Sequence, residues 1–138
     1  MSKIISTTNA IVAQEQLFTN LTPEEASILE GGYNLYVSSI VCLKDGADTF
    51  SQDDVYANVT VDEITSRLDV GGMSAGDGKN LGWEFSFAGN AEINFFDSDS
   101  PDSDDALGGF SVSGLTNGIQ RTTIAGGGSR YRVSYSVS

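Results

Sequence analysis

The sequence predicts an all-β fold: an antiparallel β-sandwich of about eight strands, preceded by a short N-terminal segment. Short runs of alternating apolar and polar residues occupy much of residues 33–138, a pattern typical of strands with one buried face. Clusters of Gly, Asp, Asn and Ser separate these runs, as expected of turns. The chain has 138 residues, enough for one domain core and an appendage but not for two full cores.

Four runs in the first part of this region alternate clearly. In YNLYVSSIVCL (33–43), one predicted face holds Leu35, Val37, Ser39, Val41 and Leu43, and the other holds Tyr36, Ile40 and Cys42. The runs VYANVTV (55–61), WEFSF (83–87) and EINFF (92–96) also place alternate apolar residues on one side. Each of the four runs is therefore predicted to be a strand.

The remaining segments give different signals. Residues 64–81, which include GGMSAGDGKN, are the least regular and are predicted to form a long loop or a weak strand. FSVSGL (110–115) and IQRTTI (119–124) flank Asn117-Gly118, which predicts a hairpin or near-hairpin. YRVSYSV (131–137) is predicted to be the last strand, with its aromatic and valine side chains on one face.

Composition excludes several classes of function. The net charge of −12 argues against nucleic acid as a partner, because phosphate binding needs clustered Lys and Arg. The chain has no His and one Cys, which excludes His-centred triads, zinc sites built on His and an internal disulfide. No run of 18 apolar residues is present, so no membrane span is predicted. Hard-cation binding through oxygen, carboxylate chemistry and plain binding remain.

Two clusters of Asp carry the chemistry. Nine of the twelve Asp residues lie in residues 45–54 and 97–105, and each window adjoins apolar strands, so each is predicted to be a loop. If both loops lie at one end of a sandwich, their carboxylates converge and repel by about 4 kcal/mol per pair at 4 Å. Ca²⁺ accepts such oxygens readily. The alternative is that both clusters are solvated acidic turns, which are common in soluble β proteins.

The spacing of these acids resembles that of the C2 domain, a calcium-dependent lipid-binding sandwich. Its first calcium loop carries two Asp six residues apart, and its third carries Asp-x-Asp with another Asp six residues later. The resemblance covers about residues 35–137 and implies a C2-like fold. It also implies Ca²⁺ as the cofactor, with the ligands Asp48, Asp54, Asp97, Asp99 and Asp105. By the same resemblance Asp45, Asp53, Asp102 and Asp104 are outer-shell or merely charged residues.

Residues 1–32 have a different character. In LFTNLTPEEASILEGG, Thr22 and Pro23 suit the start of a short amphipathic helix and Gly31 its end. The same segment resembles a bacterial double-glycine leader peptide. That resemblance implies recognition and cleavage by a peptidase-containing ABC transporter through Leu21, Glu25, Ile28, Gly31 and Gly32. The implied domains are a leader, residues 1–32, cut after Gly32, and an exported sandwich, residues 33–138.

These expectations combine into one functional hypothesis and one alternative. The hypothesis is a secreted calcium-binding sandwich that acts in extracellular recognition or adhesion, with a protein, a glycan or, weakly, a membrane surface as partner. The alternative is a bacteriocin-like or signalling cargo whose acidic loops are purely structural. Residues 33–138 carry a net charge of −9, which disfavours docking on anionic lipid. An enzyme is not expected, because the Asp residues lie in polar loops rather than in an apolar pocket that raises one pKa.

Overall fold

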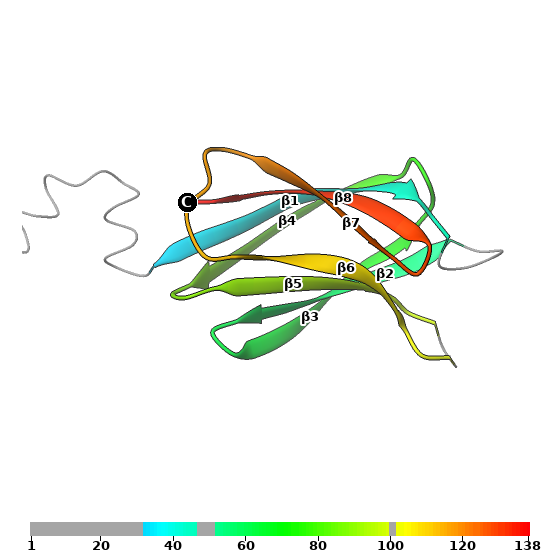
Figure 1. Cartoon of the computed structure of the whole chain (residues 1–138), viewed down its shortest axis with the longest axis horizontal. Coiled ribbons are helices and arrows are strands. Elements are labelled where there is room, and N and C mark those ends of the chain that lie inside the picture. Colours follow the sequence, from blue (N-terminus) through cyan, green and yellow to red (C-terminus); the bar gives the residue numbers. More distant parts are fainter. Residues whose placement is uncertain (1–31, 47–51, 100–101) are drawn as a thin grey trace, which may run out of the picture. The chain divides into compact units, whose positions relative to one another are not determined.

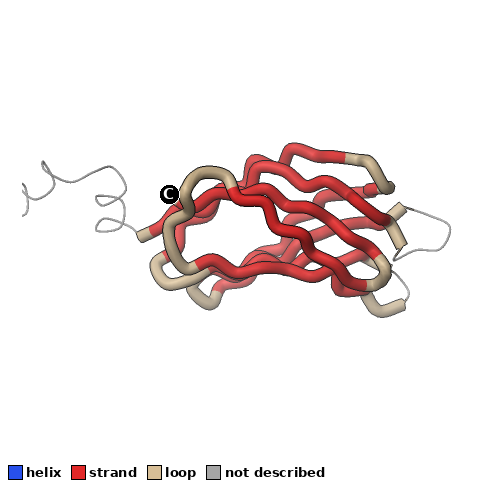
Figure 2. Tube along the Cα trace, turned by 45° about the horizontal axis from the view of Figure 1, so that its top comes forward, coloured by secondary structure: helices blue, strands red, loops and turns tan. Residues whose placement is uncertain are grey.

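The computed structural model describes residues 32–46, 52–99 and 102–138, which contain eight strands and no helix. The strands are β1 (Tyr33–Lys44), β2 (Asp53–Val61), β3 (Ile64–Met73), β4 (Gly78–Phe87), β5 (Ala91–Asp97), β6 (Asp105–Val112), β7 (Gln120–Gly126) and β8 (Ser129–Val137). They form two four-stranded antiparallel sheets, ordered β4-β1-β8-β7 and β3-β2-β5-β6 (Figures 1 and 2). The predicted β-sandwich of about eight strands is confirmed.

The predicted N-terminal leader, as a helix or a disordered segment, lies outside the described residues except for Gly32. Within the described part of the chain, no helix is long and apolar enough to cross a membrane.

The core fills the space between the two sheets. Its largest fully buried side chains include Tyr131, Phe87, Phe95, Leu35, Ile40 and Ile93. Trp83 of β4 stacks on Phe95 of β5 with ring centroids 6.4 Å apart, which joins the two sheets. Burial of each large apolar side chain stabilises the fold by about 1.5–3 kcal/mol, so this layer holds the sandwich together.

A β-bulge in β1 corrects the faces predicted for this strand. The pairing of β1 with both neighbours shifts register between Val37 and Ser39. An extra residue in a strand reverses the alternation beyond it. Consequently, Ile40 and Cys42 are buried with Leu35 and Val37, whereas Leu43 is 38% exposed. Periodicity alone placed Leu43 on the wrong face.

Of residues 64–81, predicted to be a long loop or a weak strand, residues 64–73 form β3 and residues 78–81 begin β4, so the loop alternative is wrong. Both strands lie at the edges of their sheets. Half of the β3 residues are exposed, and Leu68 and Val70 are only partly buried against the core, so the buried face of this strand is weakly marked. Gly71, with φ 101°, lies where the pairing of β2 with β3 shifts register, which explains the glycine in this strand.

The hairpin predicted around Asn117-Gly118 is wrong. β6 and β7 belong to different sheets, so residues 113–119 cross from one sheet to the other. Thr116 fixes this crossing to the end of β8: its amide donates to the Val137 carbonyl at 3.1 Å, and the Val137 amide donates to its hydroxyl at 2.9 Å. An Asn-Gly pair marks a turn but does not identify the strands that pair across it.

Candidate metal site at the acidic end of the sandwich

Strand pairing brings Asp53 and Asp54 of the first acidic window, and the described residues of the second, to one end of the same sheet. β2 begins where β5 ends and β6 begins, and these three strands are neighbours. Asp97 lies opposite Val55 of β2 on one side and opposite Asp105 of β6 on the other. We call this region the acidic end; Figure 1 shows the start of β2, the end of β5 and the start of β6 on the same side of the sheet. Its described carboxylates are Asp53, Asp54, Asp97, Asp99, Asp102, Asp104 and Asp105.

Asp97 is the centre of this arrangement. Its side chain is fully buried, and its Oδ1 accepts a hydrogen bond from the Asp54 amide at 2.7 Å. The Ser98 amide in turn donates to the Asp54 carbonyl at 2.8 Å. A hydrogen bond from an amide to an ionised carboxylate is shorter and stronger than one between neutral groups. These contacts hold Asp54, which is exposed, beside Asp97.

Asp104 fastens the loop between β5 and β6 to β2. Its Oδ2 accepts a hydrogen bond from the Tyr56 hydroxyl at 2.5 Å, and its Oδ1 accepts one from the Asp99 amide at 3.1 Å. The bond from Tyr56, and then that from the Asp99 amide, lower the pKa of Asp104. The hydrogen bond between Tyr56 and Asp104 also raises the pKa of Tyr56. The Arg67 guanidinium lies 3.6 Å from the centre of the Tyr56 ring. Asp104 is therefore more than a surface charge, although it is exposed.

Asp53 is the residue whose role the sequence did not indicate. It is fully buried, and its Oδ2 accepts hydrogen bonds from the Ser129 hydroxyl at 2.7 Å and the Tyr131 hydroxyl at 2.6 Å. Its Oδ1 has no hydrogen-bond partner among the described residues. A signal was present: Asp53 is two residues before the buried Val55 and thus on its face. Asp53 was expected to be an outer-shell or merely charged residue. In the structure it instead connects the two sheets.

Tyr131 gives a testable pH dependence. Burial, with the hydrogen bond to Asp53, raises the pKa of Tyr131 well above its ordinary value. An unfolded tyrosine ionises near pH 10, so the stability that Tyr131 contributes is present below that pH and is lost as pH rises towards the folded pKa. We expect the free energy of unfolding of the wild type to fall above about pH 10. In Tyr131→Phe, which has no hydroxyl to ionise, we expect the slope to be smaller by about 1.4 kcal/mol per pH unit. Urea unfolding at pH 9, 10 and 11 measures both slopes; parallel slopes would contradict the effect of burial.

The predicted ligands are placed only in part. Asp54, Asp97, Asp99 and Asp105 lie at the acidic end, whereas Asp48 lies outside the described residues. In the described ranges, no three acidic or Cys side chains form a group ready to hold a metal ion. The donors available are all carboxylate oxygens, as Ca²⁺ prefers, and one of them, Asp53 Oδ1, is buried without a partner in the described structure. The residues present therefore fit calcium in donor type, although the described carboxylates are not grouped as a closed site. Four of the predicted leader residues also lie outside the residues that the structure describes: Leu21, Glu25, Ile28 and Gly31.

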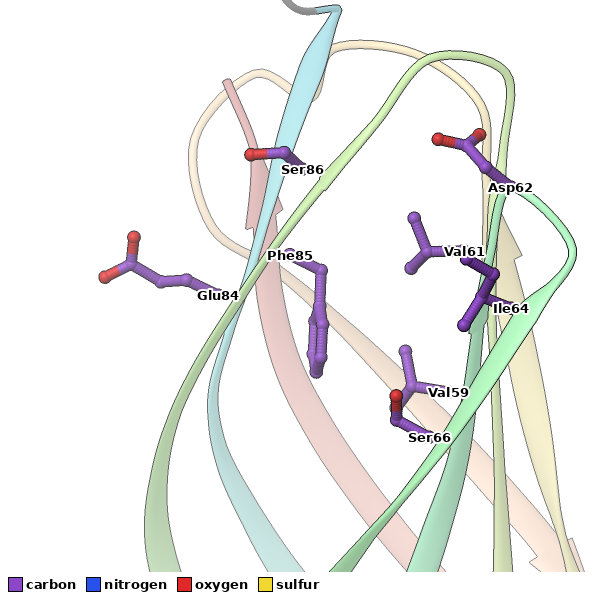
Figure 3. A pocket seen from close by; sticks show the side chains of 8 residues that line it. All are labelled: Val59, Val61, Asp62, Ile64, Ser66, Glu84, Phe85 and Ser86. Carbon is purple, nitrogen blue, oxygen red and sulfur yellow. The ribbon is translucent and has the colours of Figure 1, made fainter.

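A groove of about 400 Å³ lies at the opposite end of the sandwich, where β2 ends and β3 begins. It is lined by Val59, Val61, Asp62, Ile64, Ser66, Glu84, Phe85 and Ser86. Figure 3 shows the Phe85 ring facing Val59 and Val61, while Glu84 points away. The Asp62 carboxylate accepts from the Ala88 amide at 3.3 Å. The groove thus shares no residue with the acidic end.

Comparison with known proteins identifies the fold. No protein-family model and no curated protein matches this sequence. Similar solved structures include a C2 domain, at 18% identity and TM-score 0.50, covering 77% of this chain and 96% of that one. A C2 domain of plant extended synaptotagmin 1 is similar at 11% identity and TM-score 0.50, covering 77% of this chain and 92% of that one.

The chain is also similar to part of a much longer protein. Human GIVD cytosolic phospholipase A2, in complex with methyl gamma-linolenyl fluorophosphonate inhibitor and terbium chloride, matches at 17% identity and TM-score 0.52. This chain covers only 17% of that one. Together the similarities show that the sandwich has a C2-like fold.

Proposed function

We propose that this protein is a calcium-binding module of C2-like fold, with Ca²⁺ held at the acidic end by Asp54, Asp97, Asp99 and Asp105, and by Asp48 from the first acidic window. The observation that carries the proposal is the buried Asp97, bonded to the Asp54 amide and lying opposite Asp105. Desolvation and mutual repulsion make such a group of carboxylates costly. A bound Ca²⁺ would supply the positive charge that offsets this cost.

The role that we propose for calcium is to stabilise the fold. The described acidic end joins the start of β2 to the end of β5 and the start of β6, so an ion there would link the loops of three strands. Membrane docking is disfavoured by the chain's net charge of −12. We propose recognition or adhesion through a protein or glycan partner, and a binding rather than a catalytic role.

Calorimetry tests the calcium site directly. We expect titration of the EDTA-treated full chain with CaCl₂ to give saturable heat, and titration with MgCl₂ to give much less, because Mg²⁺ dehydrates reluctantly and demands a near-ideal octahedron. Equal, unsaturable heats for both ions would indicate only a diffuse attraction of cations to an acidic surface. That result would mean that the acidic turns bind no specific ion.

The proposed route out of the cell makes a separate prediction. Resemblance of residues 1–32 to a double-glycine leader implies that a peptidase-containing ABC transporter cuts after Gly32 and exports residues 33–138. We expect mass spectrometry of the product secreted with such a transporter to show Tyr33 as the first residue. Gly32→Val should abolish the cut, because a side chain at that position blocks a cleft that admits only glycine, whereas Gly89→Val should be cut normally. Secretion of the uncut chain would argue against the leader.

A further inference from the structure

We propose that Asp53 is a positioning residue for the acidic end: by holding the start of β2 against β8 of the opposite sheet, it sets Asp54 beside Asp97. The inference rests on the proposed calcium site for its functional meaning. The geometry on which it is built involves only described residues.

The first observation is the contact between the sheets. Asp53 belongs to the sheet β3-β2-β5-β6, while Ser129 and Tyr131 belong to β8 in the other sheet. Both hydroxyls donate to the same oxygen, Asp53 Oδ2, at 2.7 and 2.6 Å. All three side chains are at most 3% exposed. Two charge-assisted bonds to one buried oxygen leave the residue little freedom to move.

The second observation is that Ser129 connects Asp53 to the end of β1. The Gly46 amide donates to Ser129 Oγ at 3.0 Å, while the Ser129 hydroxyl donates to Asp53. Gly46 also packs on the backbone of Gly128, where a Cβ on Gly46 would overlap the Gly128 carbonyl. One serine in the first position of β8 thus ties together Gly46, just beyond β1, and Asp53, the first residue of β2.

The third observation is where this contact leads. The residue after Asp53 is Asp54, whose amide donates to Asp97 Oδ1 and whose carbonyl accepts from the Ser98 amide. Displacement of Asp53 therefore moves the backbone that orients Asp97. A buried carboxylate is costly, and Asp53 makes no ion pair with a described Lys or Arg. A role in placing the neighbouring acids accounts for a charge at a site where an apolar residue would be cheaper to bury.

The decisive variant is Ser129→Ala, which removes one of the two hydrogen bonds that hold Asp53, and the link to Gly46, without changing any charge. In EDTA, we expect hydrogen exchange of the Asp54 amide, followed by NMR, to be about tenfold faster than in the wild type, since a bond to a charged acceptor is lost. Calorimetry should show the dissociation constant for Ca²⁺ to rise by about tenfold. If Ser129→Ala does not fold, Asp53→Asn, which retains an acceptor oxygen but not its charge, should speed Asp54 exchange about threefold.

Thr116→Val is the matched control. Thr116 makes a hydroxyl contact with the same strand, β8, at the far end of the sandwich. We expect it to lower the melting temperature while leaving Asp54 exchange and the calcium dissociation constant within twofold of the wild type. If Thr116→Val changes Asp54 exchange as much as Ser129→Ala, or if neither replacement at Ser129 or Asp53 changes it, the positioning role is wrong.

The two proposals fail in different experiments. A wild-type chain that shows no calcium heat overturns the proposed calcium site. The positioning role of Asp53 is still tested in that case, because hydrogen exchange in EDTA does not depend on the ion. A wild type that binds calcium, with a Ser129→Ala variant that binds it equally well and exchanges Asp54 equally slowly, overturns the positioning role of Asp53 alone.

Discussion

Adding Ca²⁺ to the EDTA-treated full chain is expected to raise its melting temperature by roughly 10 °C. Calcium at a hundred times its dissociation constant stabilises the folded state by about 2.7 kcal/mol, and a domain near 100 residues gains about 4 °C per kcal/mol. The proposed reason is repulsion among the buried Asp97 and its acidic neighbours, which a bound cation would relieve. Differential scanning calorimetry in EDTA and in excess CaCl₂ measures the shift.

Paired neutral substitutions make this experiment specific. Asp97→Asn with Asp99→Asn should remove most of the calcium-induced shift, because two carboxylate ligands are lost, whereas the amide oxygen introduced at position 97 can still accept from the Asp54 amide. Glu84→Gln with Glu92→Gln removes the same charge from exposed positions of β4 and β5. That control should keep the full shift. A melting temperature unaffected by calcium in the wild type would falsify the stabilising role.

Gly126→Ala is expected to cost about 2–3 kcal/mol of folding free energy. On this side of the sandwich β6 and β7 approach backbone to backbone, and a Cβ on Gly126 would overlap the Ala106 carbonyl. The facing Gly108 has φ 102°, and its Cβ would lie 3.0 Å from the Ala125 carbonyl oxygen. The obstructing atoms belong to the backbone, so a methyl group there forces two strands apart; overpacking of this kind costs about 1–3 kcal/mol.

Gly114→Ala is the matched control, since the chemical change is identical. No atom lies within 4 Å of a Cβ built on Gly114, and this glycine has no positive φ. We expect a change of at most about 0.5 kcal/mol, or a slight stabilisation from the reduced freedom of the unfolded chain. Urea unfolding followed by the fluorescence of the single Trp83 compares the two variants. Equal stabilities would mean that the close approach of β6 to β7 does not limit the fold.

The prediction from the sequence was strongest where one strand has one buried face. The alternation of residues 83–87 and 131–137 identified β4 and β8 and their inward side chains, because burial of alternate residues is a local property of a strand. β3 gave only a weak signal, since this edge strand places only Met73 fully, and Leu68 and Val70 partly, in the core. The bulge in β1 reversed the faces of Val41 to Leu43, because pairing with two neighbours decides where an extra residue is inserted.

The candidate site was also predictable from the sequence only in part. The acidic windows were predicted to be loops. In the structure Asp54, Asp97 and Asp105 instead lie at the ends of β2, β5 and β6, and the antiparallel pairing of these strands brings them to one end. The role of Asp53 was not predictable, because its partners Ser129 and Tyr131 are more than 70 residues away and in the other sheet.

The sequence by itself determined the fold class, the positions of most strands and the acidic character of two segments, because each follows from residues close together in the chain. Only the tertiary structure decided which strands β6 and β7 pair with and which hydroxyls hold Asp53. Those features depend on contacts between the two sheets, and such contacts leave no periodic trace in the sequence.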